Sequence, residues 1–204
     1  MKRGLYLVTP DWNDSARLLQ VSRAAILGGA TVLQYRHKTA PPVLRLAQAR
    51  ALRALTRELG ISLIINDDLQ LALAVDAEGL HIGRDDGDIT LIKAAAGRPL
   101  QVGVSCYGDF ERARAAVSGG ADYVAFGAMY ASPTKPEAPS APIGLIRRAK
   151  QAFNNVPVAC IGGITADNAA LLIEAGADWV AVITDVYQAT DPQAQAAKIA
   201  ALYP

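Results

Sequence analysis

Gly120-Ala121-Asp122-Tyr123-Val124 recurs almost unchanged as Gly176-Ala177-Asp178-Trp179-Val180, and Gly29-Ala30-Thr31-Val32 is a weaker third copy. Each copy follows a stretch with helical spacing and leads into an apolar run. Glycine adopts the left-handed conformation that ends a helix and turns the chain into the next strand. The repeat therefore predicts a chain built from successive strand-and-helix units.

Short apolar runs alternate with longer helical patterns along the whole chain. We predict eight strands, at residues 5–8, 31–35, 62–66, 79–82, 100–105, 122–126, 157–161 and 179–183. We predict helices at residues 15–27, 41–60, 109–117, 143–153, 166–175 and 192–202. Eight such units favour a closed barrel over an open sheet, and the chain has no G-x-G-x-x-G or Walker-type loop. The predicted fold class is α/β, a single-domain (β/α)8 TIM barrel over residues 1–204.

The composition restricts the partners. The 204 residues are 51% hydrophobic and 19% charged, and 20 Lys and Arg against 19 Asp and Glu give a net charge of +1. This balance gives no electrostatic reason to expect nucleic acid or an anionic membrane surface. The N-terminal apolar run is too short for a signal peptide, and no later run reaches membrane-spanning length. We therefore expect a cytoplasmic protein with reduced Cys106 and Cys160.

Polar residues follow the second, third and fourth predicted strands. The carboxyl ends of the strands of such a barrel meet at one face, so residues distant in sequence can share a site. Alternation puts Gln34, Arg36 and Lys38 on one side of the chain, where an amide and two cations suit phosphate oxygens. Asp67 and Asp86 follow the next two strands and are suitable oxygen ligands for magnesium.

Other ionisable residues near these strand ends have ordinary interpretations. Asp68 and Asp85 suit helix starts or solvent. His81 fits a hydrogen-bonded histidine of the barrel interior better than a ligand. Neither cysteine has the neighbours expected of a catalytic thiol.

Hydroxyls, a cation and glycines follow the later strands. Ser105 ends the fifth strand, and the loop at residues 127–141 contains Tyr130-Ala131-Ser132-Pro133-Thr134-Lys135-Pro136. Its two hydroxyls and ammonium group suit an anion, although solvated loops have a similar composition. Ile161-Gly162-Gly163-Ile164-Thr165 and Ile183-Thr184 follow the last two strands, where such barrels commonly bind phosphate. Two separate anion sites indicate two phosphorylated substrates.

The order and spacing of these motifs resemble the thiamine phosphate synthase family over nearly the whole chain. The resemblance rests on Gln34-Tyr35-Arg36-His37-Lys38, Ile65-Asn66-Asp67, residues 81–86, Gly103-Val104-Ser105, Ser132-Pro133-Thr134-Lys135 and residues 161–165. It implies a transferase that joins hydroxymethylpyrimidine diphosphate to a thiazole phosphate and releases pyrophosphate.

The resemblance also implies roles for individual residues. The pyrimidine diphosphate would be held by Gln34, Arg36, Lys38, Asn66, Ser105 and Lys135, of which Arg36, Lys38 and Lys135 would stabilise the leaving group. Magnesium would be bound by Asp67 and Asp86, and the thiazole phosphate by Ser132, Thr134, Gly163, Ile183 and Thr184. Three positions depart from the family pattern: Ser132 for Thr, Thr184 for Ser, and His37 for a residue that is often acidic.

The implied mechanism is dissociative. Loss of pyrophosphate leaves a pyrimidine cation, which the thiazole nitrogen attacks without any protein nucleophile. A thiazole tautomerase, a sugar-phosphate isomerase and a phosphate-ligand sensor remain alternatives on the same barrel. We expect small-molecule substrates and no nucleic acid or membrane partner. The sequence does not fix the oligomeric state, for which a homodimer is one option.

Overall fold

The computed structural model describes residues 1–83, 86–131, 141–153 and 155–204. Its strands form a closed parallel barrel in which each strand pairs with the next and the last pairs with the first. The strands are β1 (Gly4–Val8), β2 (Ala30–Tyr35), β3 (Ser62–Asn66), β4 (Gly79–Ile82), β5 (Gln101–Tyr107), β6 (Tyr123–Phe126), β7 (Val158–Ile161) and β8 (Trp179–Val182). The predicted (β/α)8 barrel is therefore confirmed, with strand bounds shifted by two residues at most.

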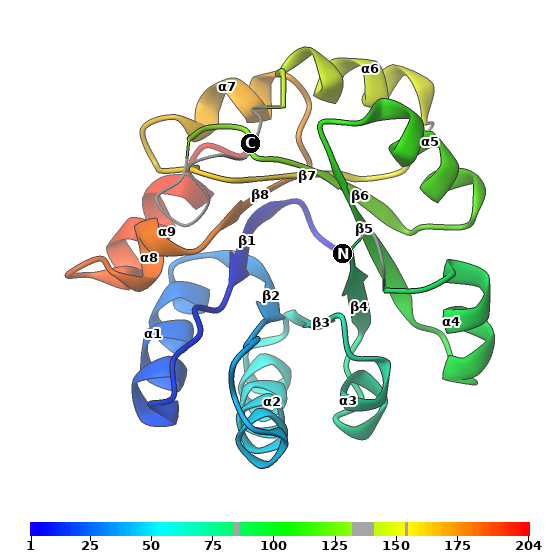
Figure 1. Cartoon of the computed structure of the whole chain (residues 1–204). Helices are drawn as coiled ribbons and strands as arrows, with labels where there is room; N and C mark the ends of the chain where they lie inside the picture. The colour runs from blue at the N-terminus through cyan, green and yellow to red at the C-terminus, as the bar shows by residue number, and fades with distance from the viewer. Residues whose placement is uncertain (84–85, 132–140, 154) are drawn as a thin grey trace.

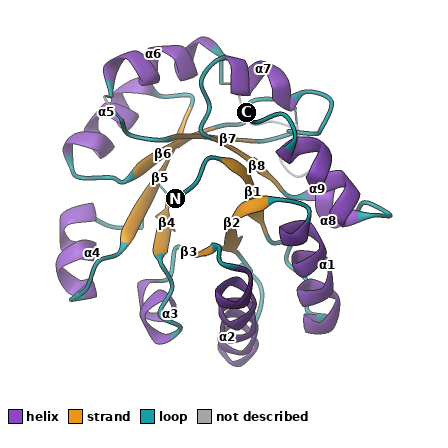
Figure 2. Cartoon of the chain, turned by 180° about the vertical axis from the view of Figure 1, so that it is seen from behind, coloured by secondary structure: helices purple, strands orange, loops and turns teal. Residues whose placement is uncertain are grey.

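Helices surround the ring of strands, as Figures 1 and 2 show from opposite sides. They are α1 (Ser15–Leu27), α2 (Pro42–Leu59), α3 (Leu69–Ala74), α4 (Ile89–Ala96), α5 (Phe110–Ser118), α6 (Gly144–Ala152), α7 (Ala169–Glu174), α8 (Thr184–Tyr187) and α9 (Pro192–Ala200). Helices α3, α4 and α8 were not among the predicted ranges. None of the helices in the described part of the chain combines the length and hydropathy that crossing a membrane requires.

Strand alternation separates two apolar layers. Residues that face outward from the strands pack against the helices, whereas a second cluster fills the barrel interior. The interior cluster consists of Tyr6, Val8, Val32, Ile64, Tyr123, Ala125, Ala159, Trp179 and Ala181. Its centre is aromatic, because the Trp179 ring meets the Tyr123 ring edge-on at 5.6 Å between centroids.

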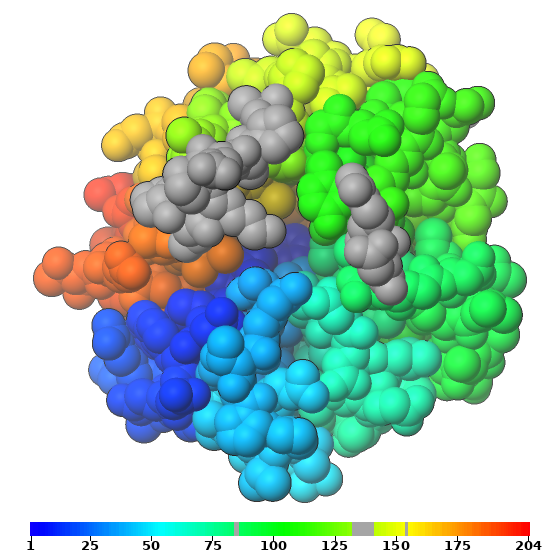
Figure 3. Space-filling view, viewed as in Figure 1, coloured from blue at the N-terminus to red at the C-terminus, as the bar shows by residue number. Residues whose placement is uncertain are grey.

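The repeated glycines turn the chain from helix to strand, as the sequence predicts. Gly29, Gly120 and Gly176 all have positive φ, at 106°, 90° and 107°. Aspartates begin many of the helices that follow the strands: Asp14, Asp68, Asp88, Asp109 and Asp191 each accept a backbone N–H of the first turn. Each such cap stabilises its helix by about 1 kcal/mol. Because all the strands run parallel, their carboxyl ends meet at one face of the barrel. In the space-filling view, the blue N-terminal segments lie against the orange and red C-terminal ones, which closes the ring (Figure 3).

Candidate active site

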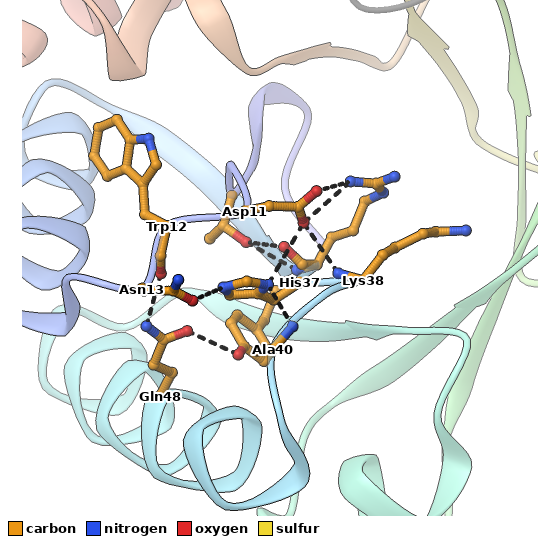
Figure 4. A network of polar contacts seen from close by, with 10 residues as sticks. Asp11, Trp12, Asn13, His37, Lys38, Ala40 and Gln48 are labelled. Atoms are coloured by element: carbon orange, nitrogen blue, oxygen red, sulfur yellow. Dashed lines mark hydrogen bonds and ion pairs between the residues drawn. The ribbon is translucent and has the colours of Figure 1, made fainter.

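The cationic segment after β2 is fixed against the end of β1. The buried Thr9 hydroxyl donates to the Arg36 carbonyl oxygen at 2.9 Å and accepts from the Arg36 backbone N–H at 2.8 Å. Asp11 Oδ1 accepts from the Lys38 backbone N–H at 3.0 Å, and Asp11 Oδ2 lies 3.3 Å from an Arg36 guanidinium nitrogen. Figure 4 shows these contacts. Two loops therefore hold the predicted phosphate-binding cations in place.

His37 holds the same segment through hydrogen bonds of its buried ring. Its side chain is fully buried, and its Nδ1 accepts from the Ala40 backbone N–H at 3.1 Å. Nε2 therefore carries the ring hydrogen and donates to Asn13 Oδ1 at 3.2 Å (Figure 4). The imidazole thus joins the loop after β2 to the loop after β1. His37, which departs from the family pattern, therefore has a structural role here: it holds the loop that carries Arg36 and Lys38.

Two carboxylates meet beside Lys38. Asp67 directly follows β3 in the left-handed conformation, with φ 61°, and its Oδ2 lies 3.4 Å from Lys38 Nζ. Burial raises the pKa of the Asp67 carboxyl, and the adjacent Asp86 carboxyl raises that pKa further. Asp86 Oδ2 also accepts from the Gly83 backbone N–H at 2.5 Å. The two predicted metal ligands are therefore brought together, although they come from different strand ends.

This carboxylate pair fits a divalent cation that takes few protein ligands. Within residues 1–83, 86–131, 141–153 and 155–204, no group of three or more His, Cys, Asp or Glu side chains is arranged to hold a metal. Magnesium commonly binds one or two carboxylates and completes its shell with water and substrate phosphates. Two neighbouring carboxylates that repel each other suit such a cation. The magnesium site itself stays a prediction.

Asp68 has the structural role that the sequence predicts for it. Its carboxylate accepts from the Leu71 backbone N–H at 2.9 Å and caps α3, while Arg45 lies 3.3 Å away. Lys38, Asn66 and Asp67 line a cavity of about 370 Å³ next to this cap. The cavity therefore offers room for a ligand that contacts Lys38, Asn66 and Asp67.

Gln34 and Ser105 belong to the polar part of the barrel interior. Gln34 Nε2 donates to the Tyr6 hydroxyl at 2.9 Å, and Ser105 Oγ lies 2.8 Å from His81 Nε2. His81 also contacts the Tyr123 hydroxyl, and burial lowers the pKa of its ring to about 4. The prediction that His81 is a satisfied interior histidine is confirmed.

Glycines shape the loop after β7. Gly163 has φ 61°, and a Cβ atom there would lie 2.4 Å from the Ala131 carbonyl oxygen. Asn168 Nδ2 donates to the Gly163 carbonyl oxygen at 3.0 Å, and Tyr130 OH donates to the Asn168 carbonyl oxygen at 3.0 Å. The loop after β7 therefore packs closely against residues 130–131.

The β8 end is joined to this loop. Thr184 is exposed at the start of α8 and, with Asp185, lines a cavity of about 520 Å³. Asp185 Oδ2 accepts from the Ala166 backbone N–H at 3.1 Å and from Gln195 Nε2 at 2.8 Å. Ile183 is half-buried against the interior cluster. The predicted thiazole-phosphate residues of β7 and β8 thus lie on loops that contact each other.

Three predicted site residues, Ser132, Thr134 and Lys135, lie outside the described residues, as does Asp85. The sequence reasoning missed Thr9, Asp11 and Arg112. Arg112 Nε donates to the Ser105 carbonyl oxygen at 2.8 Å. Thr9 and Asp11 follow β1, so the convergence of strand ends at one face of the barrel applies to them as well.

The cysteines have no catalytic arrangement. Cys106 and Cys160 are both free, as predicted, and both are buried. Burial raises the pKa of the Cys106 thiol to about 12 and raises the pKa of the Cys160 thiol as well. Neither thiol forms the thiolate that nucleophilic catalysis requires.

Fold and site together define the class: a (β/α)8-barrel enzyme with cations and paired carboxylates at its strand ends, an arrangement suited to phosphorylated ligands. A family model described as thiamine monophosphate synthase matches residues 5–186. The chain belongs to the thiamine monophosphate synthase family.

Individual relatives are similar over nearly their full length. The chain is 53% identical to the thiamine-phosphate synthase of Azoarcus sp. (strain BH72), covering 98% of this chain and 97% of the relative. It is 50% identical to that of Bordetella pertussis, covering 98% and 94%. The solved thiamine phosphate pyrophosphorylase of Pyrococcus furiosus superposes with a TM-score of 0.86 at 33% identity, covering 98% and 94%. Orotidine 5′-phosphate decarboxylase from Pyrococcus horikoshii, at 14% identity and a TM-score of 0.72, shares the fold.

Proposed function

We propose that this chain transfers the pyrimidinylmethyl group of hydroxymethylpyrimidine diphosphate to the nitrogen of a thiazole phosphate, giving thiamine phosphate and pyrophosphate. The observation that carries the proposal is the contact of Lys38 with Asp67, and of Asp67 with Asp86, across three strand ends. Membership of the family supports the same activity. A tautomerase would need neither the paired carboxylates nor the diphosphate-binding cations.

The first bond to break joins the pyrimidine methylene carbon to the diphosphate oxygen. The bonding pair leaves with pyrophosphate, and the methylene carbon becomes cationic. Arg36 and Lys38 offset the charge that develops on the leaving group, and Lys135 is assigned to the same task by the family resemblance. The Asp11 contacts hold the Arg36 guanidinium and the backbone that carries Lys38, so the Arg36 cation needs little rearrangement when the charge develops.

Magnesium, bound by Asp67 and Asp86, would supply Lewis-acid neutralisation of the diphosphate oxygens. The repulsion that raises the pKa of Asp67 favours such a cation between the two side chains. Lys38 Nζ lies 3.4 Å from Asp67 Oδ2, so its ammonium group offsets part of the negative charge of this carboxylate pair.

The second bond forms between the thiazole nitrogen lone pair and the cationic carbon, and no proton is transferred. Gly163, Ile183 and Thr184, with Ser132 and Thr134, are the proposed contacts for the thiazole phosphate. The close packing of the β7 and β8 loops favours a fixed position for that phosphate. Positioning of two reactants in this way lowers the barrier by removing much of the entropy cost of their encounter.

The test incubates the purified protein with both thiamine precursors and magnesium and measures thiamine phosphate and pyrophosphate together. We expect equal amounts of the two products and no turnover when either precursor is omitted. Isomerisation of a thiazole carboxylate phosphate without pyrophosphate release would instead identify a tautomerase. The cytoplasmic location and the homodimer option stay predictions.

A further inference from the structure

A chain of hydrogen bonds crosses the barrel interior between two of the proposed substrate contacts. It runs from Gln34 Nε2 to the Tyr6 hydroxyl at 2.9 Å, and from there to the Tyr123 hydroxyl at 2.8 Å. It continues from the Tyr123 hydroxyl to His81 Nδ1 at 2.9 Å, and from His81 Nε2 to Ser105 Oγ at 2.8 Å. The five side chains come from β2, β1, β6, β4 and β5 in that order. Residues far apart in the sequence therefore form one continuous polar path.

The path is built into the core of the barrel. Tyr6 and Tyr123 are 2% and 0% exposed, and Gln34 and His81 are 5% and 8% exposed. Gly103 makes room for the Tyr123 ring, because a Cβ atom at that position would lie 1.9 Å from the ring. Buried polar groups are costly unless each is hydrogen-bonded. The buried path is therefore stable only if each hydrogen-bond donor along it faces an acceptor.

Each tyrosine hydroxyl of the path has one hydrogen and two partners, so every group is paired when each hydroxyl accepts once and donates once. With the Gln34 amide nitrogen donating to Tyr6, this full pairing has Tyr6 donating to Tyr123 and Tyr123 donating to His81 Nδ1. His81 Nδ1 is then an acceptor, its Nε2 carries the hydrogen, and Nε2 donates to Ser105 Oγ. The Ser105 hydroxyl hydrogen is left to donate elsewhere. Ser105 is only half-buried, at the end of the barrel where the cations lie.

We propose that Tyr6, Tyr123 and His81 are positioning residues that join Gln34 to Ser105 and hold the Ser105 hydroxyl as a hydrogen-bond donor toward the diphosphate substrate. The role deepens the proposed function and rests on it. The substrate is an anion with only acceptor oxygens at its diphosphate end, so a serine that donates stabilises it. If the Ser105 hydroxyl instead donated its hydrogen to His81, only its lone pairs would face those oxygens, and it could not hydrogen-bond them.

Burial agrees with this arrangement of hydrogens. It keeps the His81 ring neutral, so one ring nitrogen is free to accept from Tyr123. It also raises the pKa of the Tyr6 and Tyr123 hydroxyls, which therefore keep the hydrogens that the path needs. The opposite direction requires the Gln34 amide oxygen to face Tyr6 and the His81 hydrogen to move to Nδ1. The two directions thus differ in an observable property, the tautomer of His81.

The first test measures that tautomer in the ligand-free protein by NMR of 15N-labelled histidine. The chain has two histidines, so a His37→Gln variant assigns the signals. We expect His81 as the Nε2–H tautomer in the wild type, and a tautomer mixture in Tyr123→Phe. An Nδ1–H tautomer in the wild type overturns the proposal. This readout does not depend on turnover, so it stands apart from failure of the proposed function.

The second test is a double-mutant cycle on the reaction. Loss of one oriented hydrogen bond predicts that Tyr123→Phe and Ser105→Ala each lower kcat/KM by about tenfold. If Tyr123 acts through Ser105, adding Tyr123→Phe to Ser105→Ala has little further effect. If the loss in kcat/KM of the double variant instead equals the product of the two single losses, Tyr123 acts independently of Ser105 and the proposal is overturned. Tyr187→Phe is the matched control, because this buried tyrosine bonds Ser22, outside the path.

Discussion

Lys38 Nζ lies 3.4 Å from Asp67 Oδ2, although the two residues follow different strands of the barrel. The contact joins a predicted phosphate-binding cation to a predicted metal ligand. Burial raises the pKa of the Asp67 carboxyl, and the neighbouring Asp86 carboxyl raises that pKa further. The charge of Asp67 is thus offset by Lys38 and opposed by Asp86, and the closed barrel brings both neighbours to it.

Asp67→Asn is the variant that tests this carboxylate. Asparagine tolerates the positive φ of 61° and keeps the side-chain shape, so the fold should survive. We expect turnover with magnesium to fall by about 100-fold, because one of two metal-binding carboxylates is lost. Asp76→Asn is the matched control, since Asp76 also has a positive φ, 53°, but pairs with Arg57 outside the site. Equal activity of the two variants would remove Asp67 from the metal site.

His37→Ala tests the anchor of the cationic loop. The change leaves the buried Ala40 backbone N–H without its acceptor and Asn13 without its donor. We expect the free energy of unfolding to fall by roughly 2–3 kcal/mol, and KM for the pyrimidine diphosphate to rise as Arg36 and Lys38 lose their fixed positions. Urea unfolding and steady-state kinetics measure the two effects. A destabilised variant with unchanged KM would show that the anchor does not position the cations.

The fold could be predicted from the sequence because its signals are local. Positive-φ glycines mark most of the turns from helix to strand, the apolar runs mark the strands themselves, and all eight strands were located from these signals. Helices α3 and α4 were missed because they are short, and α3, which reads Leu-Gln-Leu-Ala-Leu-Ala, has no charged residue to mark a polar face. Parallel neighbouring strands need a crossover connection outside the barrel, and α3 and α4 supply it after β3 and β4.

Site residues could be predicted from the sequence only where they directly follow a recognisable strand. Asp67 and Lys38 follow apolar strands, so the rule that strand ends converge identified them. The contact between Tyr6 and Tyr123 joins residues 117 positions apart and depends on how the closed barrel orients its interior. No local pattern distinguishes these tyrosines from ordinary core residues. Asp11 differs from them, because it follows β1 closely and the convergence of strand ends is enough to identify it.

The depressed pKa of His81 predicts a pH-dependent stability. Burial lowers that pKa from 6.5 to about 4, so between these pH values the unfolded chain binds a proton that the folded chain does not. The free energy of unfolding therefore falls as the pH falls through this range. In metal-free buffer we expect the titration of His81 alone to lower the free energy of unfolding of the wild type by roughly 2 kcal/mol from about pH 7 to about pH 4.5.

His81→Gln isolates that effect from the carboxylates that titrate at low pH. The variant has no imidazole to protonate, so its stability should fall less steeply than that of the wild type between the same pH values. Urea unfolding at each pH measures both slopes. Identical slopes would mean that His81 titrates alike in the folded and unfolded chain, contrary to its burial.

Gly163→Ala tests the loop proposed to receive the thiazole phosphate. A methyl group at this position would lie 2.4 Å from the Ala131 carbonyl oxygen and 2.9 Å from Tyr130 Cβ, so the loop must move. Gly60→Ala is the matched control, because Gly60 has a similar φ of 70° and nothing within 4 Å of the added methyl.

The control variant carries only the backbone cost of positive φ, about 1 kcal/mol, and should keep full activity. We expect Gly163→Ala to lose more stability than Gly60→Ala and to raise KM for the thiazole phosphate by at least about tenfold, with KM for the pyrimidine diphosphate changed less. Steady-state kinetics with each substrate varied in turn separates the two subsites. An equal rise in both KM values would contradict the assignment of this loop to one substrate, because displacement of the β7 loop would then act on the whole site.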